Sequence, residues 1–519
     1  MNLPLTNPDG DLVKADETSY KKLSLLAKRN RAVRLGSGIY AIGATASPEQ
    51  VTRHHLNAIV GLLWPGAVLC GKSAISGGVP TNGLVFFSHP GIQPRTSKIK
   101  LPGVTLVPVV GPGRLPGDLP LPGGILMSGS ARRLVENVDV RGRPGAWRAG
   151  TPATEDLLDD LARSGGAGRV QEALHQLDVI AGSFDPNPVA LVRTRLTSLL
   201  GSFSTGTAAP TSTRLAARLA GRPFDGHRVE MVERLLITLQ ARSPRPVHVG
   251  PPVTRWEWLS FFEAYFSNFI EGTEFGVEEA RRIAVDGLIP ASRPADAHDV
   301  AATYRLAGDP VDRVRVPQSG EELVSILRDR HRILMASRSD KRPGQLKEVP
   351  NYAGGYQFVE PNLVVGTLVK GFELMQPLVD PFARAVAMMV LVTECHPFDD
   401  GNGRVARLTV NAELSAAGQV RICIPTVYRI DYLSALTGFS NDAGSGQSLV
   451  AVLEFAQRWT SSVDWSSFEG ANQILTDCNA YLDPGVADRV GKRLILPSSI
   501  ASRNEPKARD IFMAPGRSR

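Results

Sequence analysis

The chain has 519 residues, of which 43% are hydrophobic and 21% charged, values typical of a globular protein with more than one domain. Its 58 basic and 51 acidic residues leave a net charge of +7, which permits a polyanionic partner without demanding one. The four cysteines form no CxxC pair, which argues against a disulfide framework or a zinc site. The N-terminus lacks the apolar segment of a signal peptide, and no apolar run approaches the ~20 residues of a membrane span. We therefore expect a cytoplasmic protein without membrane contact.

An amphipathic helix is predicted at the start of residues 18–43, which then pass through a basic turn (Lys28 to Arg34) into a strand-like GIYAI. A second helix is expected after Ser47, a suitable N-cap. Helix, basic turn and strand are typical of a winged helix-turn-helix, although a solvated basic helix face gives the same pattern. We predict a winged-helix-like α+β domain over residues 1–100 and a second α+β part over residues 101–200.

The first hundred or so residues also resemble a known family. The segments LAKRNRAVRLGSGIYAI and PGAVLCGKSAISGG are similar to the N-terminal part of AbiEi-type antitoxins, transcriptional regulators paired with nucleotidyltransferase toxins. The resemblance implies an N-terminal regulator domain. Whether that domain contacts DNA or a protein stays open.

Composition divides the rest of the chain. The segment GSFSTGTAAPTST predicts a linker and HRVEMVERLLITLQAR a connecting helix, so residues 201–250 join two halves. A mainly helical domain is expected over residues 251–465. Residues 466–519 are predicted to form a helical extension and a disordered basic tail. The predicted fold class is mainly α, with an α+β N-terminal region.

A short polar segment, HPFDDGNGR, separates two predicted apolar helices in the second half of the chain. Residues 381–394 begin with a proline and continue apolar, which predicts a buried helix that ends before His396 and Pro397. A tight turn over residues 399–403 is followed by a second helix that Gly418 can end. The Gly-Asn-Gly turn is therefore expected at a helix N-terminus, where unpaired N–H groups bind phosphates.

The side chains in and next to this polar segment suit phosphoryl or nucleotidyl transfer. Arg404 and Arg407 lie near one face of the starting helix and supply forked donors for phosphate oxygens. Asp400 is a hard oxygen ligand for Mg²⁺, and His396 can accept a proton near neutral pH. Taken alone, a residue of each of these types more often has a structural role than a catalytic one. Their ordered combination between two apolar helices predicts metal-assisted transfer with a histidine base.

The segment HPFDDGNGRVAR resembles the active-site motif of the Fic family, His-Pro-Phe-x-Asp/Glu-Gly-Asn-Gly-Arg-x-x-Arg, at every fixed position. The resemblance covers about residues 255–465 and implies an all-helical Fic core that moves AMP from ATP to a hydroxyl of a target protein, which can be the chain itself. It implies His396 as the base, Asp400 as the Mg²⁺ ligand and Arg407 as the γ-phosphate ligand. The other implied nucleotide-binding residues are Gly401, Asn402, Gly403 and Arg404.

A second short motif precedes the active-site motif. Residues 260–280 predict a helix up to Gly272, with aromatic side chains at helical spacing. Within it, SNFIEG resembles the Fic inhibitory motif, Ser/Thr-x-x-x-Glu-Gly/Asn. The resemblance implies that Ser267, Glu271 and Gly272 belong to an N-terminal inhibitory helix. A Glu271 carboxylate paired with Arg407 would keep that arginine from the γ-phosphate.

Residues 342–361, RPGQLKEVPNYAGGYQFVEP, predict a β-hairpin. In the Fic family a comparable flap lies over the active site and binds the target by strand addition. An ordinary surface hairpin is the alternative, and Lys347 stands where many relatives have an arginine. The implied target-binding residues are Gly355, Tyr356, Gln357 and Phe358.

The leading interpretation is a self-inhibited Fic protein adenylyltransferase that uses ATP and Mg²⁺. Two alternatives stay open: a transcriptional regulator or antitoxin whose Fic core senses ATP, and an enzyme that removes AMP from a modified target. The Doc subgroup, whose members phosphorylate, has a lysine in the turn and lacks the second arginine, so Gly403 and Arg407 favour AMP transfer. Many inhibited relatives are regulated by dimerisation, and a homodimer stays open here.

Overall fold

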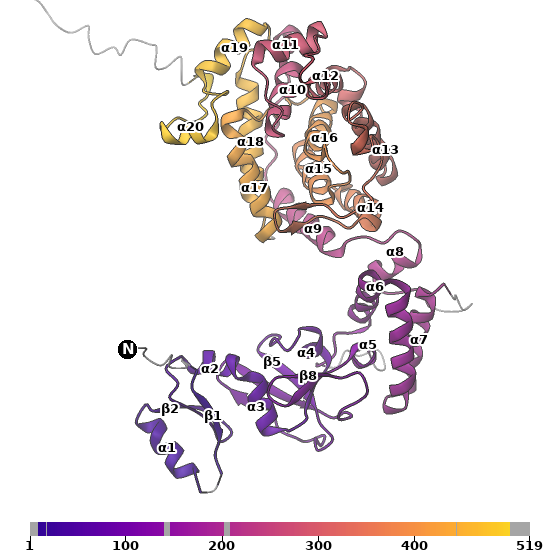
Figure 1. The fold of residues 1–519 in the computed structure, drawn as a ribbon, viewed down its shortest axis with the longest axis vertical. Helices are drawn as coiled ribbons and strands as arrows, with labels where there is room; N and C mark the ends of the chain where they lie inside the picture. The colour runs from indigo at the N-terminus through magenta and orange to yellow at the C-terminus, as the bar shows by residue number, and fades with distance from the viewer. Residues whose placement is uncertain (1–8, 17, 140–145, 202–207, 443, 499–519) are drawn as a thin grey trace, which may run out of the picture. The chain divides into compact units, whose positions relative to one another are not determined.

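The computed structural model describes residues 9–16, 18–139, 146–201, 208–442 and 444–498. The predicted basic tail, residues 499–519, and part of the predicted linker lie outside these ranges. The chain divides into two compact units, Met1–Gly221 and Arg222–Arg519, which are described separately (Figure 1). Within the described ranges, every helix is too short or too polar to cross a bilayer.

The N-terminal unit starts with a three-stranded antiparallel sheet. Strands β1 (Asp11–Lys14), β3 (Ile39–Ile42) and β2 (Ala32–Gly36) lie in that order, and α1 (Tyr20–Lys28) connects β1 to β2. The predicted helix and the GIYAI strand are present. The basic segment is more than a turn, because Arg34 lies within β2 and pairs with β3.

The helix predicted after Ser47 forms as two helices. Helix α2 (Pro48–His54) begins with a capping box, in which the Ser47 hydroxyl accepts from the Gln50 N–H and the Gln50 side chain accepts from the Ser47 N–H. His55 then leaves the helical conformation, with φ −93° and ψ 11°, and α3 (Leu56–Leu63) starts after it.

A six-stranded mixed sheet follows, in the order β6-β7-β5-β4-β9-β8. The β5–β7 and β4–β9 pairs are parallel and the other pairs are antiparallel. Short helix α4 (Gly71–Ile75) connects β4 to β5. The strands are β4 (Val68–Leu69), β5 (Leu84–Ser88), β6 (Ile99–Leu101), β7 (Val104–Val109), β8 (Leu119–Leu121) and β9 (Ile125–Met127).

Four helices complete the N-terminal unit and share one hydrophobic cluster. The second is kinked at Gly166, whose φ of 59° is not helical. The helices are α5 (Ser130–Asn137), α6 (Thr151–Ile180), α7 (Pro186–Leu199) and α8 (Thr213–Leu219).

Among the described residues of the second unit, the named elements are helices apart from one small hairpin, which pairs β10 (Tyr352–Ala353) with β11 (Tyr356–Gln357). The predicted fold class is thus confirmed: a mainly helical chain with mixed sheets in its N-terminal unit and a hairpin in its second unit. The helices are α9 (Gly226–Gln240), α10 (Leu259–Ile270), α11 (Val277–Asp286), α12 (Pro294–Gly308), α13 (Gly320–Leu334), α14 (Val364–Met375), α15 (Pro381–Cys395), α16 (Asn402–Ala416), α17 (Arg429–Asp442), α18 (Gln447–Ser462), α19 (Phe468–Asp477) and α20 (Pro484–Arg489).

Helix α15 is the centre of the larger hydrophobic core. The Asp380 side chain caps it and Pro381 opens it, as expected for a proline in a first turn. Twelve of its fifteen residues are buried, because a helix that is apolar all round must be covered on every side. Helices α9, α14 and α16 pack around it. The active-site motif follows the C-terminus of this central helix, so its position is fixed by the core.

Helix α10 is anchored by a second, aromatic core. Phe261 and Phe262 on α10 pack with Trp465 and Phe468, in a cluster that also includes residues of α11 and α18. Buried aromatic side chains bring large apolar areas out of water, so this face of α10 is firmly held. The helix also packs against α16. Its last turn therefore lies next to the active-site motif.

Candidate active site

The motif forms a turn between α15 and α16 in which two residues have left-handed backbones. His396 ends α15 with φ 46° and ψ 60°, and Gly401 precedes α16 with φ 72°. Such a backbone is uncommon for a residue other than glycine, so His396 is a strained position. Asn402 braces the turn, because its Oδ1 accepts from the Phe398 N–H at 2.9 Å and its Nδ2 donates to the Phe398 carbonyl at 2.8 Å. The Gly-Asn-Gly turn indeed lies at a helix N-terminus.

A cavity of about 670 Å³ opens over this turn. The motif, the hairpin β10–β11 and helix α17 supply its walls. Glu271, Glu394, Asp399 and Asp400 line it, and Arg407 is the one arginine among the described lining residues. The volume suits a cofactor-sized ligand. Because the lining carboxylates outnumber the arginine, a polyphosphate can enter favourably only with a cation or after a change in pairing.

His396 lines this cavity, and its imidazole has the tautomer that a general base requires. Its Nδ1–H donates to the Thr393 carbonyl at 3.2 Å, which leaves Nε2 as the ring nitrogen able to accept a proton. The Phe358 ring stacks on the imidazole with the centroids 3.8 Å apart. Burial lowers the pKa of His396 to about 4. The imidazole is therefore unprotonated at neutral pH.

Arg407 is held by the end of α10. Its Nη2 lies 2.6 Å from Glu271 Oε1, and its Nε and Nη2 donate to the Ser267 hydroxyl and carbonyl, each at 2.9 Å. Burial by itself would raise the pKa of Glu271, but the adjacent Arg407 guanidinium outweighs it and lowers that pKa. The pair is therefore ionised at neutral pH. The Arg407 side chain is 8% exposed and that of Glu271 is 28% exposed, so the carboxylate is the accessible partner.

Glu271 also lies against the Gly-Asn-Gly turn. A Cβ at Gly403 would stand 2.3 Å from Glu271 Oε1 and 3.1 Å from Arg407 Nη1, so a glycine is needed for this approach. Gly272, with φ 86°, carries the chain onward and does not line the cavity. The carboxylate is thus close to the start of α16, the position that favours an anion.

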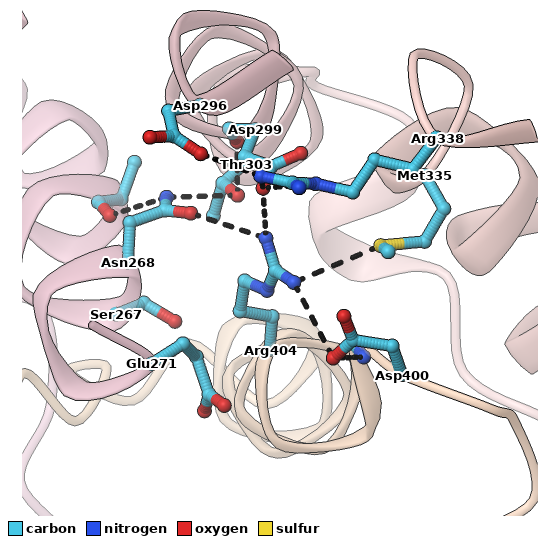
Figure 2. A network of polar contacts seen from close by, with 12 residues as sticks. Ser267, Asn268, Glu271, Asp296, Asp299, Thr303, Met335, Arg338, Asp400 and Arg404 are labelled. Atoms are coloured by element: carbon cyan, nitrogen blue, oxygen red, sulfur yellow. Dashed lines mark hydrogen bonds and ion pairs between the residues drawn. The ribbon is translucent and has the colours of Figure 1, made fainter. Parts of the chain in front are cut away.

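Arg404 points into a buried network and does not line the cavity (Figure 2). Its Nη1 is 2.8 Å from Asp299 Oδ2, and the two side chains are 4% and 1% exposed. Its further contacts are with Asn268 Oδ1 at 3.5 Å, Met335 Sδ at 3.7 Å and Asp400 Oδ1 at 4.0 Å. The structure therefore separates Arg404 from the other predicted nucleotide-binding residues.

Asp299 on α12 accepts from a second arginine. Arg338 donates to Asp299 Oδ2 from Nε at 3.0 Å and from Nη2 at 2.9 Å, and its Nη2 is also 2.6 Å from Asp296 Oδ1 (Figure 2). Two guanidinium groups thus share one buried carboxylate. This network joins the motif helix α16 to α12 and to the segment after α13.

Asp400 is the candidate metal ligand of the motif. It lines the cavity, its side chain is 44% exposed, and its Oδ1 accepts from the Gly401 N–H at 2.6 Å. Within the described ranges, no group of three or more His, Cys, Asp or Glu residues could hold a metal. Mg²⁺ keeps several waters and is often held by one or two carboxylates together with phosphate oxygens. The residues therefore fit Mg²⁺ that is bound with a nucleotide. The neighbouring Asp399 is paired with Arg342, at 2.8 and 3.1 Å.

The hairpin β10–β11 is tied to the cavity wall. The Tyr356 hydroxyl donates to Glu394 Oε2 at 2.5 Å, and the Arg228 guanidinium lies 4.6 Å from the centre of the Tyr356 ring. Burial raises the pKa of Tyr356 well above its ordinary value, so the hydroxyl remains a donor. This tyrosine anchors the hairpin. Of the predicted target-binding residues, the cavity is lined by Gly355, Tyr356 and Phe358 but not by Gln357.

Other residues of the site were not predicted. Asp299 and Glu394 are buried carboxylates on helices, and in an apolar helix such as α15 a carboxylate is itself a signal, because it needs a partner. The α17 wall has polar and apolar residues at helical spacing, which predicts one helix face but not the cavity that it lines. The lining residues from α17 are Tyr432, Leu433, Leu436, Thr437, Ser440 and Asn441.

Part of the second unit is similar to known proteins. Residues 323–414 match the model of the Fic/DOC family, so the chain contains a Fic/DOC domain. It is distantly related to protein adenylyltransferases: the fic-1 proteins of Caenorhabditis elegans and Caenorhabditis briggsae are each 23% identical to it over 181 residues. That match covers 34% of this chain and 36% of each relative. The chain thus spans about a third of the length of these curated relatives.

Solved structures of Fic proteins are also similar to parts of the chain. Fic-1 of C. elegans, residues 134–508, is 17% identical and covers 60% of this chain and 86% of its own, with a TM-score of 0.35. A Fic domain containing signaling protein from Bacteroides thetaiotaomicron is 19% identical and covers 47% of this chain and 97% of its own, also with a TM-score of 0.35.

Proposed function

We propose that the second unit is a self-inhibited protein adenylyltransferase that transfers AMP from ATP to a Ser, Thr or Tyr hydroxyl of a target protein. The observation that carries the proposal is the placement of unprotonated His396, Asp400 and Arg407 around one cavity on the turn of a Fic/DOC domain. The distant relationship to protein adenylyltransferases supports the same reaction.

In the proposed reaction the acceptor hydroxyl oxygen attacks the α-phosphorus of ATP. A new P–O bond forms, the bond from that phosphorus to the bridging oxygen breaks, and pyrophosphate leaves. His396 Nε2 takes the hydroxyl proton, while Thr393 and Phe358 hold the ring in place. Asp400 would hold Mg²⁺, which when bound neutralises phosphate charge. The N–H groups of Asn402 and Gly403 at the start of α16 would donate to phosphate oxygens.

The Glu271–Arg407 pair is proposed to inhibit this reaction. Arg407 is the cavity arginine and would bind the γ-phosphate, but its donors are directed to Glu271 and Ser267. Glu271 also brings a negative charge to the anion-binding turn next to Gly403. A nucleotide then binds with its α-phosphate displaced, and a displacement of ~1 Å can cost on the order of 10²-fold in rate.

Label transfer from ATP tests the proposal. Glu271→Gly should transfer AMP to protein at a rate at least about 10-fold above the parent chain, because Arg407 is released. Glu274→Gly is a matched control in the same loop, since Glu274 is exposed, and it should leave the rate unchanged. Adding His396→Ala to Glu271→Gly should abolish transfer. Equal rates for Glu271→Gly and the parent would refute the inhibitory pair, and labelling that persists without His396 would refute the base.

Two alternatives use the same residues. If the chain removes AMP from a modified target, the ionised and partly exposed Glu271 would orient water, and Glu271→Gly would lose that activity. If the Fic core only senses ATP, nucleotide would bind without transfer in every variant. Incubation with an adenylylated protein, followed by measurement of released AMP, separates the first alternative from the proposed reaction.

We also propose a nucleic-acid contact for the N-terminal unit, because its first helix, the turn after it and the following strand carry six exposed basic residues. Exposed basic residues bind phosphates with strong salt dependence. Charge reversal at Lys28, Arg29 and Arg31 in the full chain should remove DNA binding, and binding that is insensitive to salt and to these changes would argue against the contact. The exposed basic residues are Lys21, Lys22, Lys28, Arg29, Arg31 and Arg34.

A further inference from the structure

The backbone around His396 is held by a segment outside the motif. Because α15 ends at Cys395 and His396 turns into the left-handed region, the carbonyls of residues 395–398 have no helical partners of the usual kind. Buried carbonyls need donors. Four such carbonyls follow one another at the position of the proposed base.

The segment before the hairpin supplies these donors. The Lys347 Nζ donates to the Cys395 carbonyl at 3.1 Å, and the Lys347 N–H donates to the Pro397 carbonyl at 2.9 Å. Asn351 Nδ2 donates to the carbonyls of His396 at 3.3 Å and of Phe398 at 2.9 Å. Every carbonyl from 395 to 398 is thus bound by Lys347 or Asn351.

Lys347 and Asn351 also bind each other. The Lys347 Nζ donates to Asn351 Oδ1 at 2.7 Å, so the amide is oriented with its Nδ2 toward the turn. Lys347 is 3% exposed and its side-chain hydrogen bonds go to neutral acceptors. A lysine is rarely buried in this way, because removing an ammonium group from water is costly. We call this pair the Lys347–Asn351 clamp.

The same segment holds the imidazole ring. The Phe358 N–H donates to the Asn351 carbonyl at 3.2 Å, which closes the base of the hairpin, and the Phe358 ring stacks on His396. The clamp therefore fixes the backbone of His396 while Phe358, at the base of the hairpin, covers its ring. The hairpin and His396 are therefore connected through Asn351 and Phe358.

We propose that Lys347 and Asn351 are positioning residues that hold the strained His396 backbone so that its Nε2 faces the cavity. This inference rests on the proposed function, because it gives the base its orientation. Neither residue lines the cavity, so the clamp acts through His396 and not on the nucleotide. Loss of the clamp should lower kcat for transfer and leave the KM for ATP unchanged.

The charge of Lys347 adds a readout that a purely structural role would not give. Burial lowers the pKa of His396, and the nearby Lys347 cation lowers it further, whereas Glu271 and Asp400 act in the opposite direction. Lys347 itself faces Arg228, Asp399 and Cys395, and burial lowers its pKa to about 8. Removal of the lysine charge, or a new carboxylate at position 351, should therefore move the acid limb of the rate profile to higher pH.

Three clamp variants in the Glu271→Gly background test the inference. Lys347→Met and Asn351→Asp should lower kcat between about 10- and 100-fold, leave the ATP KM within about twofold, and shift the acid limb upward. Lys347→Arg keeps the charge and the donors and should retain kcat within about threefold. Lys341→Met, on the same segment with its lysine at the surface, is the control and should match the parent. Unchanged kcat in both Lys347→Met and Asn351→Asp, or a KM that rises as kcat/KM falls, would overturn the clamp.

Hydrogen exchange separates failure of the clamp from failure of the proposed function. Asn351→Asp should speed exchange of the backbone amides of His396 and Phe398 at least about 10-fold, whether or not the chain transfers AMP, because the carbonyls of these two residues lose the Asn351 donor. Lys341→Met should leave these amides unchanged. Unaltered exchange in Asn351→Asp would overturn the clamp, whereas absence of AMP transfer from the Glu271→Gly parent would refute the adenylyltransferase assignment alone.

Discussion

The two arginines of the motif lie one turn apart on α16 and are both buried, yet their surroundings differ. Arg404 is paired with Asp299, whose side chain is 1% exposed and is shared with Arg338. Arg407 is paired with Glu271, whose side chain is 28% exposed and borders the cavity. An ion pair with two buried partners is costly to open, whereas one with an accessible carboxylate can exchange it for another anion. The Arg404–Asp299 pair is therefore a fixed brace of the structure. The Arg407–Glu271 pair is a replaceable contact, because another anion can take the place of Glu271.

The largest expected difference between the two sides is in stability. Asp299→Ala leaves the Arg404 and Arg338 guanidinium groups without their shared carboxylate, which should lower the free energy of unfolding by about 3–5 kcal/mol. Glu271→Gly should lower it by less than about 2 kcal/mol, because Ser267 still accepts from Arg407 and the cavity admits water. Urea unfolding of the parent and both variants measures this. Equal losses would contradict the distinction between brace and replaceable contact.

Replacing each of the two arginines by lysine compares their roles in nucleotide binding. In the Glu271→Gly background, Arg407→Lys should raise the KM for ATP about 10-fold, because lysine cannot bind a phosphate through a fork. Arg404→Lys should leave that KM within about twofold, since its guanidinium is paired with the buried Asp299 (Figure 2) and Arg404 does not line the cavity. Steady-state kinetics with varied ATP gives both values. A KM that rises for Arg404→Lys as for Arg407→Lys would place both arginines on the nucleotide.

A smaller effect is expected at Ser267. Its hydroxyl accepts from Arg407 Nε at 2.9 Å and helps to direct the guanidinium toward α10. Ser267→Ala removes this hydrogen bond, leaves Glu271 in place, and should raise label transfer about fivefold above the parent chain, in line with one hydrogen bond of about 1 kcal/mol. Thr273→Ala, in the loop after α10, serves as a control. Transfer that stays at the parental rate would show that Ser267 has no part in the inhibition.

The smallest effect is expected from pH. The Arg407 guanidinium lowers the pKa of Glu271 below its ordinary value of 4.5, so the ion pair is complete above that value and is lost only as pH falls through the lowered pKa. The rate ratio of Glu271→Gly to the parent should therefore stay constant within about twofold between pH 6 and pH 8. A ratio that collapses in this window would show that the inhibitory contact depends on another titrating group.

The sequence predicted the local features of the site better than its long-range contacts. The helices on either side of the motif, the Gly-Asn-Gly turn at a helix N-terminus and the hairpin follow from proline and glycine positions and from apolar runs. The pairing of Arg404 with Asp299 could not be predicted in this way. Asp299 is far from Arg404 in the chain, and local patterns carry no signal for such a pair. Lys347 was noticed as a departure from relatives, but its bonds to the carbonyls after α15 depend on tertiary packing.

We propose that Glu271 holds an otherwise complete adenylyltransferase site inactive. The most direct test is intact-mass analysis of the parent chain, Glu271→Gly and the variant that also carries His396→Ala, each incubated with Mg²⁺, ATP and a mixture of potential target proteins. ATP labelled in its α-phosphate or in its γ-phosphate identifies the group transferred. We expect Glu271→Gly to add AMP to protein with the α-label, far more than the parent, and the His396→Ala combination to add none. Transfer of the γ-label, or equal modification by the parent and Glu271→Gly, would contradict it.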